Sequence, residues 1–299
     1  MSAIEQAQHR HVYDLATPGL PPAVACSARL DQRSNGALCG VSVEGACASV
    51  ALLRAQRGAG SAVQVSAAEK FFFVLEGALT ADLDGRLHEV PAQHALHVPA
   101  GMPHALRAAC DTRFILALSR NAAAMTGVFD DAGWVEHANA ATQSFTRQSG
   151  DAVTRYVYPI DELNAVPPGE SSAKVVPKNF VSGKSSSFGA ALSGAALHVG
   201  VIHKARGSGA KLHTHPNEQF NVVLEGRLLG EIATVPMDVA PYGLVHMPAG
   251  VPHCTMASAD GDIAVFVVKD TSHGLSGPPV DGIEDGPRYL PGFGPRAGV

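Results

Sequence analysis

The chain has 299 residues, of which 46% are hydrophobic and 16% charged, and its formal net charge is -5 with a pI near 6.3. This length favours one large domain or two of ordinary size, and so much apolar sequence excludes a chain that is disordered throughout. A slightly acidic chain without a dense Lys/Arg block makes nucleic acid and anionic lipid poor candidate partners.

The N-terminus and the cysteines indicate a soluble cytoplasmic protein. The first residues lack a basic segment followed by an apolar stretch, and no apolar run is long enough to span a bilayer. An odd number of cysteines with no CxxC pair argues against a disulfide framework, so we expect reduced thiols. The five are Cys26, Cys39, Cys47, Cys110 and Cys254.

Two motifs occur twice along the chain. Residues 73–77 read FVLEG and recur as VVLEG, and residues 98–104 read VPAGMPH and recur as MPAGVPH. Gly226 lies 149 residues after Gly77, and His253 lies 149 residues after His104. Because both motifs share one offset, the pattern indicates a duplication.

Short strands are expected in each half. An apolar strand should follow each Pro-His turn, at Phe114–Leu118 and Ile263–Val268, and a pair of strands is expected at Leu197–His203 and Phe220–Leu224. Short runs of β-branched and aromatic residues, broken by many of the 31 glycines and 20 prolines, favour an all-β sandwich or barrel.

The segment between the two halves, from about Ser119 to Pro177, is predicted to be a linker with one or two short helices. It contains Trp134, the only tryptophan, and a Pro-Pro-Gly turn at 167–169. The resulting domain prediction is an N-terminal barrel at 1–145, a linker at 146–177 and a C-terminal barrel at 178–299.

The C-terminal half contains a candidate metal site. His213 and His215 are two residues apart, so on a strand they face the same side, about 7 Å apart. The same alternation aims Gln219 inward and Glu218 outward, although Glu218 or water remains an alternative fourth ligand. His253 follows a rigid Pro-Ala-Gly-Val-Pro turn. Three imidazoles with one oxygen donor suit Fe, Mn, Co, Ni, Cu or Zn better than Ca or Mg.

These residues resemble the two sequence motifs of the cupin superfamily. The first is matched by Gly207, His213, His215 and Gly226, and the second by Pro248, Gly250 and His253. The one departure is Gln219, where most metal-binding cupins have Glu. The resemblance covers about residues 40–118 and 190–270, and it implies a bicupin with two double-stranded β-helix (jelly-roll) barrels. Cupins commonly pair through sheet edges, which leads us to expect a homodimer.

The N-terminal copy has lost most of the site. Subtracting the offset from the ligand positions gives Gln64, Ser66, Lys70 and His104, of which only His104 suits a metal. A lysine there would repel a cation, so we predict one divalent transition metal per chain, of unknown identity among Fe, Mn, Zn and Ni.

Several nearby residues have less certain roles. Asn221, Glu218 and His203 could support the ligands or contact a substrate, and each could equally be an ordinary strand residue. His246 matches His97 at the same offset, which favours a role in the fold, and strand parity turns Cys254 away from the site.

The predicted function is a metal-dependent enzyme that acts on a small molecule. A neutral Gln leaves the ion its full charge, which favours anionic or enolisable substrates. Dioxygenase chemistry is the first hypothesis, because three imidazoles can hold Fe(II) with open positions. An isomerase, lyase or hydrolase acting through a metal-stabilised enolate is the alternative, and a non-catalytic cupin that binds a small ligand is a third. No catalytic base is assigned.

Overall fold

The computed structural model describes residues 11–16, 28–34, 37–83, 85–120, 128, 134–135, 154–165, 169–176, 186–274 and 286–295. Strands dominate these residues, and the helical element named among them is the 3-10 helix η1 (Ile160–Ala165). This confirms the all-β prediction. Within these ranges no helix has the length and apolar character needed to cross a membrane.

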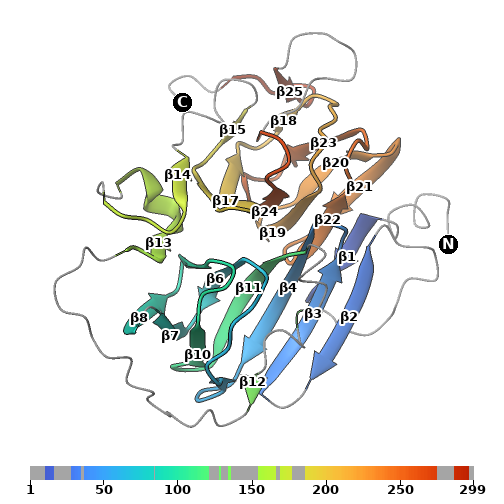
Figure 1. Cartoon of the computed structure of the whole chain (residues 1–299). Coiled ribbons are helices and arrows are strands. Elements are labelled where there is room, and N and C mark those ends of the chain that lie inside the picture. The colour runs from blue at the N-terminus through green and yellow to red at the C-terminus, as the bar shows by residue number, and fades with distance from the viewer. Residues whose placement is uncertain are drawn as a thin grey trace. The chain divides into compact units, whose positions relative to one another are not determined.

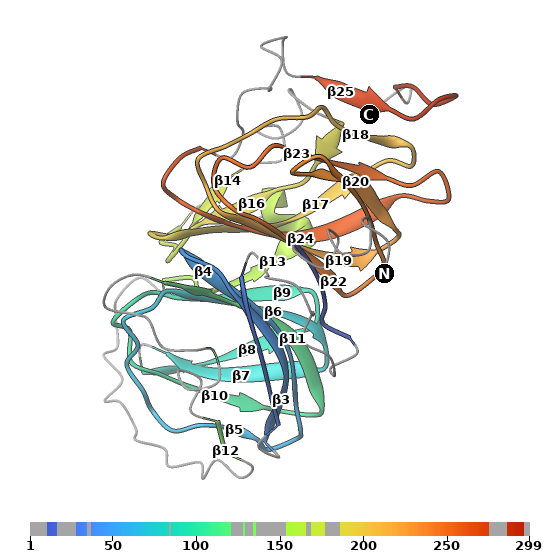
Figure 2. The same cartoon turned by 90° about the vertical axis from the view of Figure 1, so that its right-hand side faces the viewer.

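The chain divides into two compact units, one formed by residues 30–174 with 193–197 and the other by the remainder. The first, the N-terminal unit, consists of two antiparallel sheets that lie in two layers (Figures 1 and 2). One sheet has the order β13 (Val157–Pro159), β9 (His94–Val98), β6 (Lys70–Glu76), β11 (Thr112–Ser119), β4 (Ala48–Ala55), β3 (Leu38–Glu44) and β2 (Arg29–Ser34). The other has the order β12 (Trp134–Val135), β5 (Gly60–Ser61), β10 (His104–Ala108), β7 (Ala78–Leu83) and β8 (Arg86–Pro91).

The second, C-terminal unit repeats this plan. Its larger sheet has the order β1 (Val12–Asp14), β22 (Gly243–Met247), β19 (Gln219–Glu225), β24 (Ile263–Asp270), β17 (Leu197–Lys204), β16 (Ala191–Ser193) and β14 (Lys174–Val176), and β15 (Ser187–Phe188) pairs with β17. The smaller sheet has the order β21 (Val235–Val239), β20 (Leu228–Ile232), β23 (His253–Ala257), β18 (Ser208–Ala210) and β25 (Pro287–Tyr289). The strands expected as a pair, β17 and β19, are not neighbours, because β24 lies between them.

Each core forms between the two sheets of its unit. In the N-terminal unit, Phe72 and Leu96 from the larger sheet join Leu79 and Leu106 from the smaller one. In the C-terminal unit, alternate residues of β24 point into the core, which is the pattern of a strand with one buried face. The duplication is thus visible in the packing as well as in the sequence.

Parts of the predicted linker belong to the sheets. Trp134 lies in β12, pairs with Ser61 of β5 and stacks on Phe114 with 5.7 Å between ring centroids. Tyr158 of β13 pairs with Ala95 of β9. Strands of two or three residues are too short to show an alternation of apolar and polar residues. This explains why the sequence predicted a linker there. Much of the remaining segment lies outside the described residues, and the limits at 145 and 177 stay a prediction.

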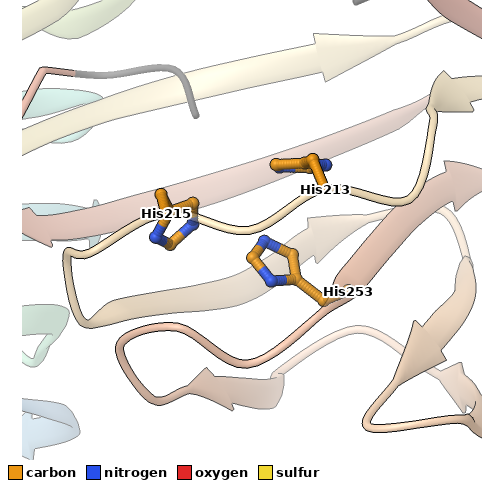
Figure 3. Close-up of side chains that lie close together, drawn as sticks. All are labelled: His213, His215 and His253. Atoms are coloured by element: carbon orange, nitrogen blue, oxygen red, sulfur yellow. The ribbon is translucent and has the colours of Figure 1, made fainter. Parts of the chain in front are cut away.

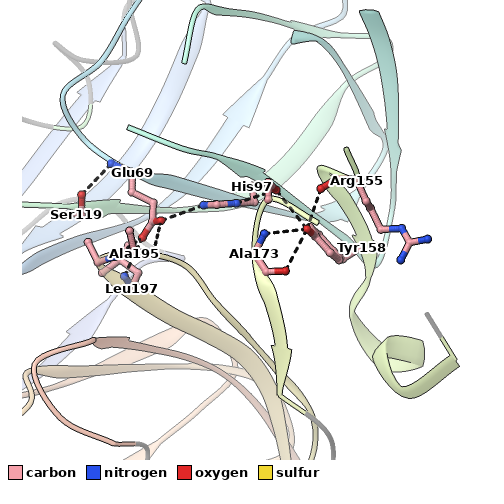
Figure 4. Close-up of polar contacts among 10 residues, drawn as sticks. Glu69, His97, Ser119, Arg155, Tyr158, Ala173, Ala195 and Leu197 are labelled. Atoms are coloured by element: carbon pink, nitrogen blue, oxygen red, sulfur yellow. Dashed lines mark hydrogen bonds and ion pairs between the residues drawn. The ribbon is translucent and has the colours of Figure 1, made fainter. Parts of the chain in front are cut away.

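A buried Glu–His pair occurs at the same place in both units. In the N-terminal unit, Glu69 Oε1 lies 3.0 Å from His97 Nε2 (Figure 4). His97 also stacks on Phe71. In the C-terminal unit, Glu218 Oε1 lies 2.8 Å from His246 Nε2, and His246 stacks on Phe220. These pairs lie on the sheet face opposite to the core, which supports the interpretation that His246 serves the fold.

Candidate metal centre

Three histidines of the C-terminal unit converge (Figure 3). His213 and His215 lie between β18 and β19, and His253 begins β23. The backbone N–H groups of His213 and His253 each donate to the other residue's carbonyl oxygen at 3.0 Å, which fixes the two chains side by side. One ring nitrogen from each histidine lies within 4.8 Å of those of the other two. This spacing allows the three imidazoles to bind one ion.

The backbone orients all three rings in the same way. Each Nδ1 lies 2.8 Å from a carbonyl oxygen two residues away, and the three carbonyls belong to Lys211, Asn217 and Val251. An Nδ1–H that donates to a carbonyl leaves Nε2 as the metal-binding nitrogen.

The Nε2 atoms of His215 and His253 are buried and have no hydrogen-bond partner. Buried polar atoms are nearly always bonded, so two such nitrogens facing one point fit a bound divalent transition metal.

The environment also keeps two of the three histidines neutral. Burial, helped by the charge of Lys269, lowers the pKa of His215 to about 4. Burial, followed by the neighbouring His213 and His215, lowers the pKa of His253 well below its usual value. Neutral imidazole is the form that binds metal, so these two candidate ligands would need to lose no proton at neutral pH.

The loop that carries His215 is tied to the end of β24. The side chain of Asn217 is buried, and its Nδ2 donates to the carbonyl oxygens of Asp270 at 2.7 Å and His273 at 3.1 Å. Asp270 Oδ2 accepts the backbone N–H of Glu218 at 2.6 Å. Because Asn217 also supplies the carbonyl that orients His215, these contacts hold the imidazole in place.

Gln219 lies beside the histidines, and Glu218 does not face them. The Nε2 of Gln219 donates to Asn221 Oδ1 at 2.7 Å, which points the amide oxygen away from Asn221. Glu218 lies on the opposite strand face with His246. His203 stacks on Phe188 with 5.3 Å between ring centroids. Metal binding by Gln219, and roles of Asn221, Glu218 and His203 at the site, stay predictions.

Lys269 is a buried charge that the sequence analysis missed. It is the cross-strand partner of Gln219, and only 4% of its surface is exposed. Its charge contributes to lowering the pKa values of both His215 and His253. No local motif surrounds Lys269, so its place beside the histidines becomes visible only from the pairing of β19 with β24.

The N-terminal unit keeps the same backbone but has an ammonium group where the ion would be. Gln64 and His104 exchange backbone hydrogen bonds at 2.9 Å, as His213 and His253 do. Lys70 Nζ donates to His104 Nε2 at 3.1 Å. Among the described residues, His213, His215 and His253 are the one group of at least three His, Cys, Asp or Glu side chains suited to a metal.

Cys254 follows a candidate ligand but faces another way. Its thiol is buried, and Arg288 Nη1 lies 3.5 Å from Sγ. Burial raises the pKa of this thiol, which keeps it protonated and unreactive at neutral pH. This environment supports the packing role expected for Cys254.

Comparisons with known proteins agree with the two-barrel architecture. The family model for the cupin domain matches residues 52–118 and again residues 200–269. Solved structures of oxalate decarboxylase are similar in fold. A Bacillus subtilis serine-to-alanine variant has a TM-score of 0.56 at 12% identity, with 91% of this chain and 82% of that chain covered. A structure of the same enzyme, named for its Mn(II) centres, has a TM-score of 0.57 at 11% identity, with 89% of this chain and 78% of that chain covered. No curated protein matches this chain.

Proposed function

Because this chain is a bicupin, a member of the cupin superfamily with a cupin domain in each half, we propose that it is a metal-dependent enzyme acting on a small molecule. The observation that carries the proposal is the pair of buried Nε2 atoms, on His215 and His253, that have no hydrogen-bond partner and converge with His213. The C-terminal unit would hold one divalent ion, and the N-terminal unit would hold none.

Dioxygenase chemistry is the first reaction class. Three neutral imidazoles and an amide oxygen suit Fe(II), which when bound supplies open positions for a substrate and for O2. The chain's own contribution is to orient the imidazoles through the carbonyls of Lys211, Asn217 and Val251. Val245 and Met247, two buried core residues on the same sheet face as Gln219, would make this side of the site apolar.

Non-redox chemistry is the second candidate, and Lys269 favours it. Burial lowers the pKa of Lys269 to about 8, close enough to neutral pH for an ammonium group to give up and regain a proton. The similar solved structures are named for the decarboxylation of oxalate, and one of them for its Mn(II) centres. An isomerase or lyase would use such a group to move a proton on an anionic substrate.

The first test is the metal content of protein purified without oxygen and without added metal. We expect about one ion per chain, lost in His253→Ala and retained in the matched control His104→Ala. Iron together with O2 consumption would support a dioxygenase, whereas manganese, nickel or zinc with turnover in the absence of O2 would support the second candidate. A chain without metal would contradict the proposal and leave a ligand-binding cupin. The homodimer and the cytoplasmic location stay predictions from the sequence.

A further inference from the structure

Three side chains of the N-terminal unit form a hydrogen-bonded line that the proposed function does not use. Glu69 Oε1 lies 3.0 Å from Nε2 of His97 (Figure 4), and Nδ1 of the same ring lies 2.9 Å from Ser172 Oγ. His97 belongs to β9, Glu69 directly precedes β6, and Ser172 lies two residues before β14, yet all three belong to one compact unit. A hydroxyl, an imidazole and a carboxylate in this order are the groups that activate a serine for acyl transfer.

The carboxylate of Glu69 determines which nitrogen of the His97 ring carries the proton. Burial would raise the pKa of Glu69, but its hydrogen bonds with His97 and with backbone N–H groups outweigh burial and hold this pKa below the usual value of 4.5. Because an ionised carboxylate can only accept hydrogen bonds, a neutral His97 donates to it through Nε2–H. Nδ1 then carries the lone pair, so Ser172 Oγ donates to Nδ1 and is placed to lose its proton there.

Ser172 is held in place by its neighbours and is still partly exposed. Its backbone N–H donates to the carbonyl oxygen of Arg155 at 2.9 Å, and the next N–H, that of Ala173, donates to the Tyr158 hydroxyl at 3.0 Å. The same hydroxyl lies 3.2 Å from Ser172 Oγ. These contacts fix the serine against the ring of His97, which is only 1% exposed, whereas Ser172 itself is half-buried. A partly exposed hydroxyl on a buried base is the arrangement that a nucleophile needs to meet a small substrate.

We propose that Ser172 is a nucleophile activated by His97, and that the N-terminal unit hydrolyses small esters without a metal. A bond forms between Ser172 Oγ and the ester carbonyl carbon, and the bond from that carbon to the alcohol oxygen breaks. The Oγ proton passes to His97 Nδ1 and then to the departing alcohol. Water next attacks the acyl group on Ser172, and its proton returns through Nδ1 to Oγ as the free acid leaves. Glu69 is a positioning residue, because it acts only by orienting the ring.

The first probe is diisopropyl fluorophosphate, which loses fluoride when an activated serine attacks its phosphorus atom. The full-length protein would be incubated with it at pH 7, and the adduct would be located by peptide mass spectrometry. We expect about one adduct per chain, on Ser172, and none in Ser172→Ala. Ser171→Ala is the matched control. It removes the exposed serine next in the chain, so it should keep the adduct.

Hydrolysis of p-nitrophenyl acetate measures the activity itself. It should be lost in Ser172→Ala, and its kcat should fall by about 100-fold or more in His97→Gln because no base remains. Treatment with a chelator should leave it unchanged. Nitrogen NMR tests the positioning role of Glu69: the His97 ring should carry its proton on Nε2 in wild type and on Nδ1 in Glu69→Gln, because an amide N–H can turn toward Nε2.

The inference is overturned if wild type forms no adduct at Ser172, if His97→Gln hydrolyses the ester as fast as wild type, or if hydrolysis disappears with the chelator. If His97→Gln does not fold, Ser172→Cys replaces it. Its thiol should react with iodoacetamide about tenfold or more faster than that of Ser171→Cys, although position 171 is more exposed, because the imidazole lowers the pKa of the thiol at 172. Equal rates would also overturn the inference. A chain without metal would contradict the proposed function and leave these results unchanged.

Discussion

The geometry of each histidine is determined by its own backbone neighbourhood. A carbonyl two residues away fixes the Nδ1 of His213, His215 and His253, so the three rings are oriented without any bound ion. Such preorganisation lowers the cost of assembling the ligands, because little side-chain entropy remains to be lost on binding. The side-chain amide of Gln219 is likewise oriented by its hydrogen bond to Asn221.

Replacing Gln219 with Glu tests its place as the fourth ligand. Gln219→Glu should bind the divalent ion about tenfold or more tightly, because a carboxylate adds a negative charge next to it and next to Lys269. Competition with a chelator measures the change. Glu218→Gln, which alters a carboxylate on the opposite strand face, should leave metal affinity unchanged. Equal affinity of Gln219→Glu and wild type would show that this side chain does not reach the ion.

Sequence reasoning located the histidines because their spacing is local. The two-residue step from His213 to His215, and a rigid turn before His253, define the cluster without knowledge of the sheet. The same alternation places Gln219 and Glu218 on opposite strand faces, and Glu218 contacts His246 on its face. Lys269 could not be found in this way, because its position depends on the register of β24 against β19, which is interrupted between Val223 and Glu225.

At the scale of elements, the Glu–His pair of the N-terminal unit anchors a turn. The carboxylate of Glu69 accepts the backbone N–H groups of Ala195, Ala196 and Leu197 at 2.7 to 2.9 Å, in addition to its contact with His97. Burial would raise the pKa of Glu69, but the hydrogen bonds to His97 and to these backbone groups outweigh it and hold the pKa below 4.5. No sequence pattern links residue 69 to residues 195–197, so this contact was not predictable.

Glu69→Gln should therefore destabilise the protein by about 2 kcal/mol at pH 7, because a buried charged acceptor is lost. A carboxyl group whose pKa is lowered on folding stabilises above its unfolded pKa, and this contribution disappears as pH falls through the folded pKa. The difference in the free energy of unfolding between wild type and Glu69→Gln should therefore become smaller below about pH 4.5.

Urea denaturation of wild type and Glu69→Gln at pH 7 and at pH 4 measures this difference in the free energy of unfolding. Glu76→Gln is the matched control, since Glu76 is exposed and its ion pair with Arg113 should contribute less than about 0.5 kcal/mol. An equal loss of stability in Glu69→Gln and Glu76→Gln would contradict the role assigned to Glu69. So would a stability difference between wild type and Glu69→Gln that does not change with pH.

At the scale of the whole molecule, duplication preserved the scaffold of both units while their interiors diverged. The backbone bridge at Gln64 and His104 repeats that at His213 and His253, and a buried Glu–His pair supports each larger sheet. In the N-terminal unit, Lys70 bonded to His104 and the apolar Leu118 stand where the other unit has Gln219 and Lys269. The repeated motifs predicted two barrels, because each motif encodes a complete strand or turn. Short strands far from these motifs, such as β1, carried no comparable signal.

β1 gives the last prediction, because it joins the C-terminal unit from the start of the chain. Val12, Tyr13 and Asp14 pair with β22, and Val12 packs against the core cluster that includes Val245. A chain that begins at Ala28 should lose this edge, so we expect hydrogen exchange in β22 to accelerate by about tenfold or more while β11 of the N-terminal unit keeps its protection. Peptide-resolved exchange measured by mass spectrometry compares the two strands. Unchanged exchange in β22 would show that β1 adds no stability there, and a uniform rise in both strands would show that the first 27 residues stabilise the chain as a whole.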